Sequence, residues 1–401
     1  MSGRGKGPLA GVRVLDLTSV LMGPYATQIF ADLGADVIKI ESPDGDTIRP
    51  LPPGHDSMRG GMFLNVNRGK RSLVLDLKQP AARDTLLKLA ETADVFVHSM
   101  RAQAIARLGL DYSAVKAANP RIVYANLYGF ARDGPYRDYP AYDDIVQAAS
   151  GLVDLQARLS GGTPTYIATV IADKVAGLTG AYAIAAALFA RERTGLGQEL
   201  EIPMFETMVS FTMIEHVGGA LFDPAIGPPV YPRVTSEARR PYATCDGHVG
   251  VMIYNDKQWR AFFHAIGDPD WSRSPIFATM RSRADNITAC LAQVAAVLET
   301  RTTAEWLALF REAQLPAMAI ASTEDLLHDP HLVDTGFWQS RDTDAGPLRF
   351  PGIPTRFSET PGAIGDPGPA LGADSRAILS DHGFDAAAID ALIAAGAVRT
   401  S

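Results

Sequence analysis

The first 200 residues alternate between short apolar strands and amphipathic helices, and this alternation constrains the fold more than any other feature. Residues 12–17 ("VRVLDL") are expected to form a strand, residues 23–34 ("GPYATQIFADLG") a helix, and residues 35–41 ("ADVIKIE") a second strand. Pro24 suits the first turn of that helix, and Gly34 suits its C-terminal cap. The three segments together predict a βαβ unit.

Further units of the same kind follow along the chain. Strands are expected at "KRSLVLDL", "DVFVHS" and "RIVYANLYGF", with helical segments "PAARDTLLKLAETA" and "AIARLGLDYSAVKAANP" between them. Strands that alternate with helices are typical of a doubly wound parallel sheet. The sequence therefore predicts an α/β fold with a large Rossmann-like domain in roughly residues 1–200.

The character of the chain changes after Gly195. Residues 201–225 are expected to form a linker helix, and residues 226–325 a smaller α+β domain that includes a hairpin at 242–254. A return linker is expected at 326–340. With 401 residues, the chain is too long for one ordinary core, which agrees with two domains.

Composition and motifs exclude several classes of function. The formal net charge of −8 argues against general nucleic-acid binding but allows a local basic pocket for phosphates. The longest apolar run, Leu178 to Ala190, is shorter than the ~20 residues that span a bilayer, so no membrane association is expected. Two cysteines without a CxxC pattern suit a reducing, cytoplasmic location. His328 and His331 lack an evident third ligand, so no metal is expected.

Two groups of residues could bind a ligand. Residues 18–24 ("TSVLMGP") join the first strand to the first helix, where an open α/β sheet forms its ligand crevice, although an ordinary turn would need the same Gly-Pro. The basic residues of the N-terminal half could bind a ligand with several phosphates, although solvated surface charge is the better explanation for any one of them taken alone. They are Arg68, Lys70, Arg71, Arg101, Arg107 and Arg121.

A third group consists of acids beside small residues. Asp143, Asp144 and Asp173 flank such segments, and Asp173 stands within "PTYIATVIADKVAG". A desolvated carboxylate can act as a nucleophile toward an activated acyl carbon. Alternatively, Asp173 could cap a helix that starts near Lys174. The two interpretations are compatible.

Together, these segments resemble the class III CoA-transferase family, which includes formyl-CoA transferase, carnitine CoA-transferase and, as an offshoot, α-methylacyl-CoA racemase. The resemblance covers residues from about 8 to 360. Its motifs include "PLAGVRVLDLTSVLMGPYATQIFADLGADVIKIE", "NRGKRSLVLDLK", "PAYDDIVQAASG", "ADKVAG" and "DLLHDPHLVDTGFW". It implies that residues from about 340 to 401 complete the large domain, and that two chains interlock as a homodimer.

The resemblance also implies a mechanism and a set of site residues. Asp173 would attack the donor thioester, form a mixed anhydride and then an aspartyl-CoA thioester, and pass CoA to a carboxylic acid acceptor. Succinyl-CoA is a possible donor. Tyr142 and Asp143 would form the wall of the active site. Coenzyme A, as the substrate, would contact Val20, Leu21, Met22, Lys70, Arg71, Arg107 and Leu108.

Departures from the family pattern bear on the choice of reaction and substrate. Formyl-CoA transferase has Gln where this chain has Leu21, and the run of glycines typical of oxalate-using members is missing, which disfavours oxalate. Arg233, Arg239 and Arg240 could meet a substrate carboxylate or could belong to a surface loop. The racemase alternative lacks its His base, because Tyr142 occupies that position. An inactive CoA-binding homologue is a further alternative, against which the retained Asp173 speaks.

Overall fold

The computed structural model describes residues 6–344 and 346–401, and the described chain divides into two compact units. The first unit comprises the described residues of Met1–Ser150, Ala168–Phe211 and Val333–Ser401. The second comprises Gly151–Ile167 and Thr212–Leu332. Residues 151–167, which lie within the expected large domain, thus group with the second unit.

A seven-stranded, mostly parallel sheet forms the centre of the first unit. The strand order is β12-β3-β2-β1-β4-β5-β6, and only the short β12 runs antiparallel to its neighbour. The order 3-2-1-4-5-6 of the parallel strands is that of dinucleotide-binding Rossmann sheets. The strands are β1 (Arg13–Leu17), β2 (Asp36–Glu41), β3 (Arg71–Leu75), β4 (Val95–His98), β5 (Val123–Tyr128), β6 (Gln198–Pro203) and β12 (Val398–Arg399).

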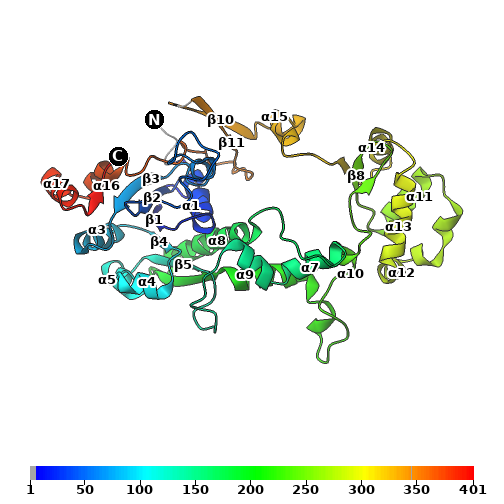
Figure 1. Ribbon diagram of the computed structural model, residues 1–401, viewed down its shortest axis with the longest axis horizontal. Coiled ribbons are helices and arrows are strands. Elements are labelled where there is room, and N and C mark those ends of the chain that lie inside the picture. Colours follow the sequence, from blue (N-terminus) through cyan, green and yellow to red (C-terminus); the bar gives the residue numbers. More distant parts are fainter. Residues whose placement is uncertain (1–5, 345) are drawn as a thin grey trace. The chain divides into compact units, whose positions relative to one another are not determined.

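Helices cover both faces of this sheet because its strands are apolar on both sides. One face carries Leu15, Ile38 and Phe96 and packs against five helices. These are α3 (Pro80–Ala90), α4 (Ala102–Arg107), α5 (Tyr112–Ala118), α16 (Ser375–Asp381) and α17 (Ala386–Ala394). The opposite face packs against α1 (Met22–Asp32) and α8 (Ile171–Thr194), which also contact each other. Figure 1 shows the C-terminal helices, in red, beside the blue N-terminal strands, so both ends of the chain build one unit.

The long helix α8 requires comment because its composition is apolar. By length and composition alone, this 24-residue helix could cross a membrane. The helix therefore extends well beyond the apolar run that the sequence suggested. Half of its most apolar window is buried inside the protein, where it packs on α1, β5 and β6, which is the behaviour of a core helix. Gly195, with φ of +75°, ends it in a left-handed cap.

The remaining elements of the first unit are small. They are α2 (Gly61–Val66), α6 (Asp143–Ala149) and the antiparallel hairpin of β10 (Trp338–Thr343) and β11 (Gly346–Pro351). Two further helices, α9 (Met204–His216) and α15 (Pro330–Asp334), include the points where the chain changes unit.

The second unit has a core of its own, built around Trp259, Phe262, Trp306 and Phe310. A three-stranded antiparallel sheet in the order β7-β8-β9 contains the expected hairpin. Its elements are α7 (Leu152–Leu159), η1 (Gly218–Leu221), α10 (Pro232–Thr235), β7 (Tyr242–Ala243), β8 (His248–Val251), α11 (Asp256–Ala265), η2 (Asp270–Arg273), η3 (Pro275–Phe277), α12 (Met280–Asp285), α13 (Ile287–Leu298), α14 (Thr303–Glu312), β9 (Ala317–Ala319) and η4 (Asp325–Leu327).

Candidate active site

The carboxyl ends of β1 and β4 meet at the point where the strand order reverses. From β1 the chain proceeds outward to β2 and β3 and then returns to β4 on the other side of β1. Open α/β sheets bind their ligands in the crevice that this reversal creates. A cavity of about 380 Å³ lies here, and its wall includes Ser19 and Val20 after β1, Ser99 and Arg101 after β4, and Asp173.

Asp173 enters this cavity from the first turn of α8. The helix begins at Ile171, and its N-cap is Val170, whose side chain makes no capping hydrogen bond. The interpretation of Asp173 as the N-cap is therefore wrong, because the helix starts two residues before Asp173. The capping acceptor comes from another helix: the Asp143 carboxylate accepts a hydrogen bond from the backbone N–H of Asp173 at 3.0 Å.

Asp143 is itself held in place by its own helix. It lies in the first turn of α6, and one of its oxygens accepts a hydrogen bond from Gln147 Nε2 at 2.6 Å. The same Gln147 nitrogen donates to the carbonyl of Thr169 at 3.3 Å. These contacts fix the segment that leads into α8, so the position of Asp173 is set by α6 as well as by its own helix.

The surroundings of Asp173 favour its neutral form. Burial, and next the charge of the nearby Asp143, raise the pKa of Asp173 to about 7. A carboxylate with this pKa is more basic than an ordinary one and is still substantially ionised at neutral pH. Such perturbed carboxyl groups in a crevice are candidates for chemistry.

The small residues after Asp173 serve helix packing rather than ligand clearance, at least at Gly177. A Cβ atom there would lie 2.6 Å from the carbonyl oxygen of Met22 and 3.2 Å from Tyr25. The absence of a side chain therefore lets α8 approach the start of α1 closely. This contact sets the N-terminal turns of α8 directly against the first turn of α1.

The loop after β1 directs its side chains to two sides. Val20 and Met22 line the cavity that contains Asp173, and Val20 also packs against the apolar cluster around Leu21. Leu21 does not line that cavity; it is buried in a cluster with Ile48, Phe63 and Val66 and lines a different, apolar cavity of about 690 Å³. The structure thus brings two of these three predicted residues to Asp173.

The structure does not bring Lys70 or Arg71 to this cavity. The Lys70 ammonium is fully buried and donates to Asp16 Oδ2 at 3.0 Å, and also to Thr27 and Asn67. Arg71 forms ion pairs with Asp36 and Asp381 at 2.6 and 2.9 Å. Both cations are occupied by carboxylates of the fold itself, so they act in the structure rather than as phosphate ligands.

A second cavity, of about 510 Å³, adjoins the first. Ser19 and Ser99 line both cavities, and the backbone N–H of Ser19 donates to Ser99 Oγ at 3.2 Å between them. Leu108 and Lys78 line the second cavity. Arg107 precedes Leu108 in the sequence, and its side chain is exposed. Its Nε donates a hydrogen bond to the carbonyl of Gln103. The two cavities together form an elongated site that runs past the ends of β1 and β4.

The other predicted residues have the following surroundings. Tyr142 lines the first cavity and is 68% exposed. Arg233, Arg239 and Arg240 lie in the second unit; Arg233 packs over the ring of Tyr254, and the other two are exposed. Within residues 6–344 and 346–401, no three His, Cys, Asp or Glu side chains are arranged to hold a metal ion.

Sequence reasoning missed several residues of this site. In the sequence Ser99 is only the end of an expected strand, although the residue after β4 faces the residues after β1 once the strand order is known. Gln147 gives a weak signal, since it follows Asp143 by four residues and so shares its helix face. Lys78 gives no signal apart from lying just after a strand, whereas Ser19 belongs to the loop at 18–24 that the sequence does identify as a candidate ligand site.

Comparison with known proteins places these features in a family. Residues 9–375 match the model of CoA-transferase family III. The chain is 32% identical to the succinyl-CoA:mesaconate CoA-transferase of Haloarcula marismortui, over 94% of this chain and 97% of that protein. It is 34% identical to the acetyl-CoA:oxalate CoA-transferase of Acetobacter aceti, over 89% and 92%. A crystal structure of a variant of a probable fatty acyl-CoA transferase of Mycobacterium tuberculosis superposes with a TM-score of 0.82 at 28% identity, over 94% and 99%.

Proposed function

Because the chain belongs to CoA-transferase family III, and so is a class III CoA-transferase, we propose that it transfers CoA between carboxylic acids with Asp173 as the covalent nucleophile. The observation that carries this proposal is the placement of Asp173. Its carboxyl group is buried in the wall of the crevice, next to the loop after β1, and has a pKa raised to about 7. A desolvated carboxylate of raised basicity is suited to attack an activated acyl carbon.

The proposed reaction proceeds by exchange of activated acyl groups. A carboxylate oxygen of Asp173 bonds to the thioester carbon as the carbon–sulfur bond breaks, which gives a mixed anhydride and CoA thiolate. The thiolate then attacks the Asp173 carbonyl carbon, releases the donor acid and leaves an aspartyl-CoA thioester. The acceptor carboxylate attacks this thioester and expels the thiolate, which takes the acceptor acyl group from the second anhydride and regenerates Asp173. No net oxidation or proton transfer is required.

The two cavities share Ser19 and Ser99, so a single extended ligand such as CoA can occupy both. We propose that the adenosine lies in the cavity lined by Lys78 and Leu108, that the diphosphate lies where Ser19 and Ser99 join the two cavities, and that the pantetheine continues to Asp173. Arg101, an exposed cation in the wall of the first cavity, would meet a phosphate. Val20 and Met22 would contact the thioester.

The relatives guide the proposal for the substrates. One is named for succinyl-CoA and mesaconate and another for acetyl-CoA and oxalate, so both act on dicarboxylic acceptors. We propose succinyl-CoA as donor and a dicarboxylic acid as acceptor. Incubation with succinyl-CoA and a panel of mono- and dicarboxylic acids, with new thioesters identified by mass, tests this. New thioesters formed only with monocarboxylic acids would contradict the proposed acceptor class.

The covalent role of Asp173 has its own experiment. Asp173→Ala should abolish transfer while free CoA still binds, and the wild-type protein should form a hydroxylamine-sensitive acyl-enzyme with succinyl-CoA. Lys174→Met is the matched control, because the adjacent ammonium donates to Thr169 Oγ1 and lines the apolar cavity instead. Substantial transfer by Asp173→Ala would exclude the proposed role. Deuterium incorporation at the α-carbon of a 2-methylacyl-CoA without CoA exchange would favour the racemase reaction.

A homodimer is part of the proposal. Helix α8 exposes Leu178, Tyr182 and Phe189 at 49, 66 and 60%, and their spacing places them near one face of the helix. An apolar stripe of this kind on a core helix is suited to a partner chain. Light scattering should give twice the monomer mass, and Tyr182→Glu should shift the protein toward monomer. A wild-type protein that is monomeric at micromolar concentration would exclude the dimer.

A further inference from the structure

Val20 adopts a backbone conformation that its side chain disfavours. Three described non-glycine residues have a positive φ, and Val20, at +69°, is the only β-branched one among them. A β-branched residue in the left-handed region is strained and persists only where its surroundings enforce it. Since Val20 also lines the cavity of Asp173, the groups that enforce this conformation bear on the active site.

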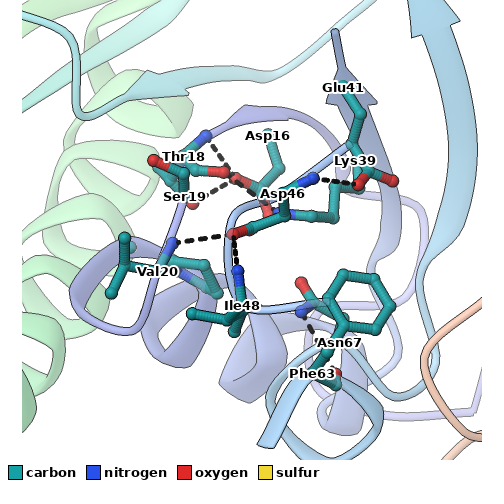
Figure 2. A network of polar contacts seen from close by, with 12 residues as sticks. Asp16, Thr18, Ser19, Val20, Lys39, Glu41, Asp46, Ile48, Phe63 and Asn67 are labelled. Carbon is teal, nitrogen blue, oxygen red and sulfur yellow. Dashed lines mark hydrogen bonds and ion pairs between the residues drawn. The ribbon is translucent and has the colours of Figure 1, made fainter. Parts of the chain in front are cut away.

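A single buried carboxylate holds this loop from behind. Asp46 Oδ1 accepts hydrogen bonds from the backbone N–H groups of Val20 and Ile48, both at 3.2 Å. Asp46 Oδ2 pairs with the Lys39 ammonium at 2.9 Å, and the same ammonium donates to the Thr18 carbonyl at 3.0 Å. Figure 2 shows Asp46 in the middle of this arrangement. The loop is therefore held at both ends, through the carbonyl of Thr18 and the N–H of Val20.

The left-handed turn decides which side chains reach Asp173. Val20 and Met22 line the cavity, while Leu21 is buried against Ile48 and Phe63. Ile48 is also the second backbone donor to Asp46. One carboxylate thus ties the turn to the apolar cluster that anchors Leu21. Release of the Val20 N–H would free the turn and, with it, the direction of Val20 and Met22.

Lys39 and Asp46 belong to the lining of the second cavity, but their charges are already satisfied within the fold. Their side chains are 0 and 1% exposed, and each pairs with the other. The backbone N–H of Asp46 donates to Glu41 Oε1 at 3.0 Å, and Glu41 in turn pairs with Arg49. The pair is thus built into the fold behind the loop, which leaves it the role of setting the loop's conformation.

We propose that Asp46 is a positioning residue for the reaction: by holding Val20 in the left-handed conformation, it directs Val20 and Met22 into the cavity and so places the acyl thioester against Asp173. The proposal rests on the proposed function for its effect on the reaction, whereas the link between Asp46 and the Val20 conformation can be tested without any activity.

Substitutions at Val20 in two backgrounds test that link. Glycine adopts a positive φ without strain, whereas alanine does not. In the presence of Asp46, Val20→Gly should therefore have a higher urea midpoint of unfolding than Val20→Ala. In the Asp46→Ala background the difference between the two midpoints should shrink or reverse, because alanine has no side-chain acceptor for the Val20 N–H. An unchanged difference would overturn the proposal.

Kinetics with succinyl-CoA test the effect on the reaction. Asp46→Ala should lower kcat/KM by about tenfold or more, because small displacements of reacting groups cost that much, while the Kd of free CoA changes by less than about threefold. Asp32→Ala is the matched control, since it also removes a buried carboxylate, paired with Arg68 at 2.6 Å, and should leave kcat/KM unchanged. Wild-type kcat/KM in folded Asp46→Ala would overturn the proposal.

The outcomes separate this proposal from the proposed function. If the wild-type protein forms no acyl-enzyme with succinyl-CoA, the proposed donor is wrong, but the unfolding midpoints still test Asp46 and Val20. If Asp46→Ala does not fold, the Val20 variants in the wild-type background decide. A midpoint of unfolding of Val20→Ala at or above that of Val20→Gly would show that the fold does not hold residue 20 in the left-handed conformation.

Discussion

The backbone N–H of Asp173 donates to the carboxylate of Asp143 at 3.0 Å, although 30 residues separate them. Two acidic side chains from different helices therefore lie close together. The contact caps α8 and, at the same time, places a negative charge beside the carboxyl group proposed to act as the nucleophile. Structure and reactivity are coupled through this one contact.

Replacement of Asp143 by Asn should move the pH dependence of the reaction. The charge of Asp143 contributes to the raised pKa of Asp173, which is about 7, so its removal lowers that pKa. More Asp173 is then ionised in weak acid, and the acid limb of the profile of kcat/KM against pH should shift to lower pH. Asp144→Asn, at the exposed neighbouring position, is the control and should leave the limb in place. An unmoved limb in Asp143→Asn would contradict the prediction.

Replacement of Asp173 by Asn should stabilise the fold at neutral pH. The pKa of Asp173 rises from 3.8 to about 7 on folding, so the folded state binds more protons between these values and its stability falls as pH rises through this window. The gain above pH 7 is at most about 4 kcal/mol, at ~1.4 kcal/mol per pKa unit. Urea unfolding at pH 5 and pH 8 should give a larger stabilisation at pH 8. An equal change in the free energy of unfolding at both pH values, or a loss of stability, would contradict a raised pKa for Asp173.

Lys70→Met should destabilise the protein rather than weaken CoA binding. Burial raises the pKa of Asp16, but Lys70 and Lys39 outweigh this effect and hold it at about 2. Loss of Lys70 leaves a buried carboxylate without its main partner, which costs about 3–5 kcal/mol. Chemical denaturation measures this loss, and calorimetry on the folded fraction should give an unchanged Kd for CoA. A stable variant with weakened CoA binding would contradict the structural role and show that Lys70 contacts CoA.

Arg101→Ala should have the opposite pattern. Arg101 is exposed in the cavity wall, so its removal leaves the fold intact but removes a charge-assisted contact to phosphate. We expect the Kd of CoA to rise about tenfold, and the difference to shrink at high salt. Arg376→Ala is the control, because that exposed arginine pairs with Asp390 on the C-terminal helices. Calorimetric Kd values that do not differ between the two variants would exclude a role for Arg101 in binding.

Leu21→Gln should cost stability and bring no gain in activity. The family resemblance aligns this position with a glutamine near the substrate, but here the side chain is 7% exposed among Ile48, Phe63 and Val66. An amide buried there without partners costs about 1–3 kcal/mol. Thermal unfolding and steady-state kinetics measure both effects. A stable variant with increased kcat would mean that residue 21 can face the cavity.

The sequence by itself determined the architecture of the first unit and the family. Alternating strand and helix patterns are local, and each is visible from the period of its own apolar residues. All five strands expected in residues 12–130 belong to the sheet. The helix that carries Asp173 was also visible, as was the likelihood of a ligand at the loop after β1. These features depend on a few neighbouring residues, which is why they could be read directly.

Only the tertiary structure decided what each polar residue does. Lys70, Arg71 and Arg101 look alike in the sequence, but the first two are neutralised by carboxylates that other strands and helices bring to them, and the third is not. Leu21 is buried in an apolar cluster next to the positive φ of Val20, whose backbone N–H donates to Asp46, 26 residues away. Asp143 meets Asp173 only because α6 and α8 pack together. Such pairings depend on strand order, helix packing and backbone dihedrals, and long-range contacts of this kind leave no local pattern from which they could be predicted.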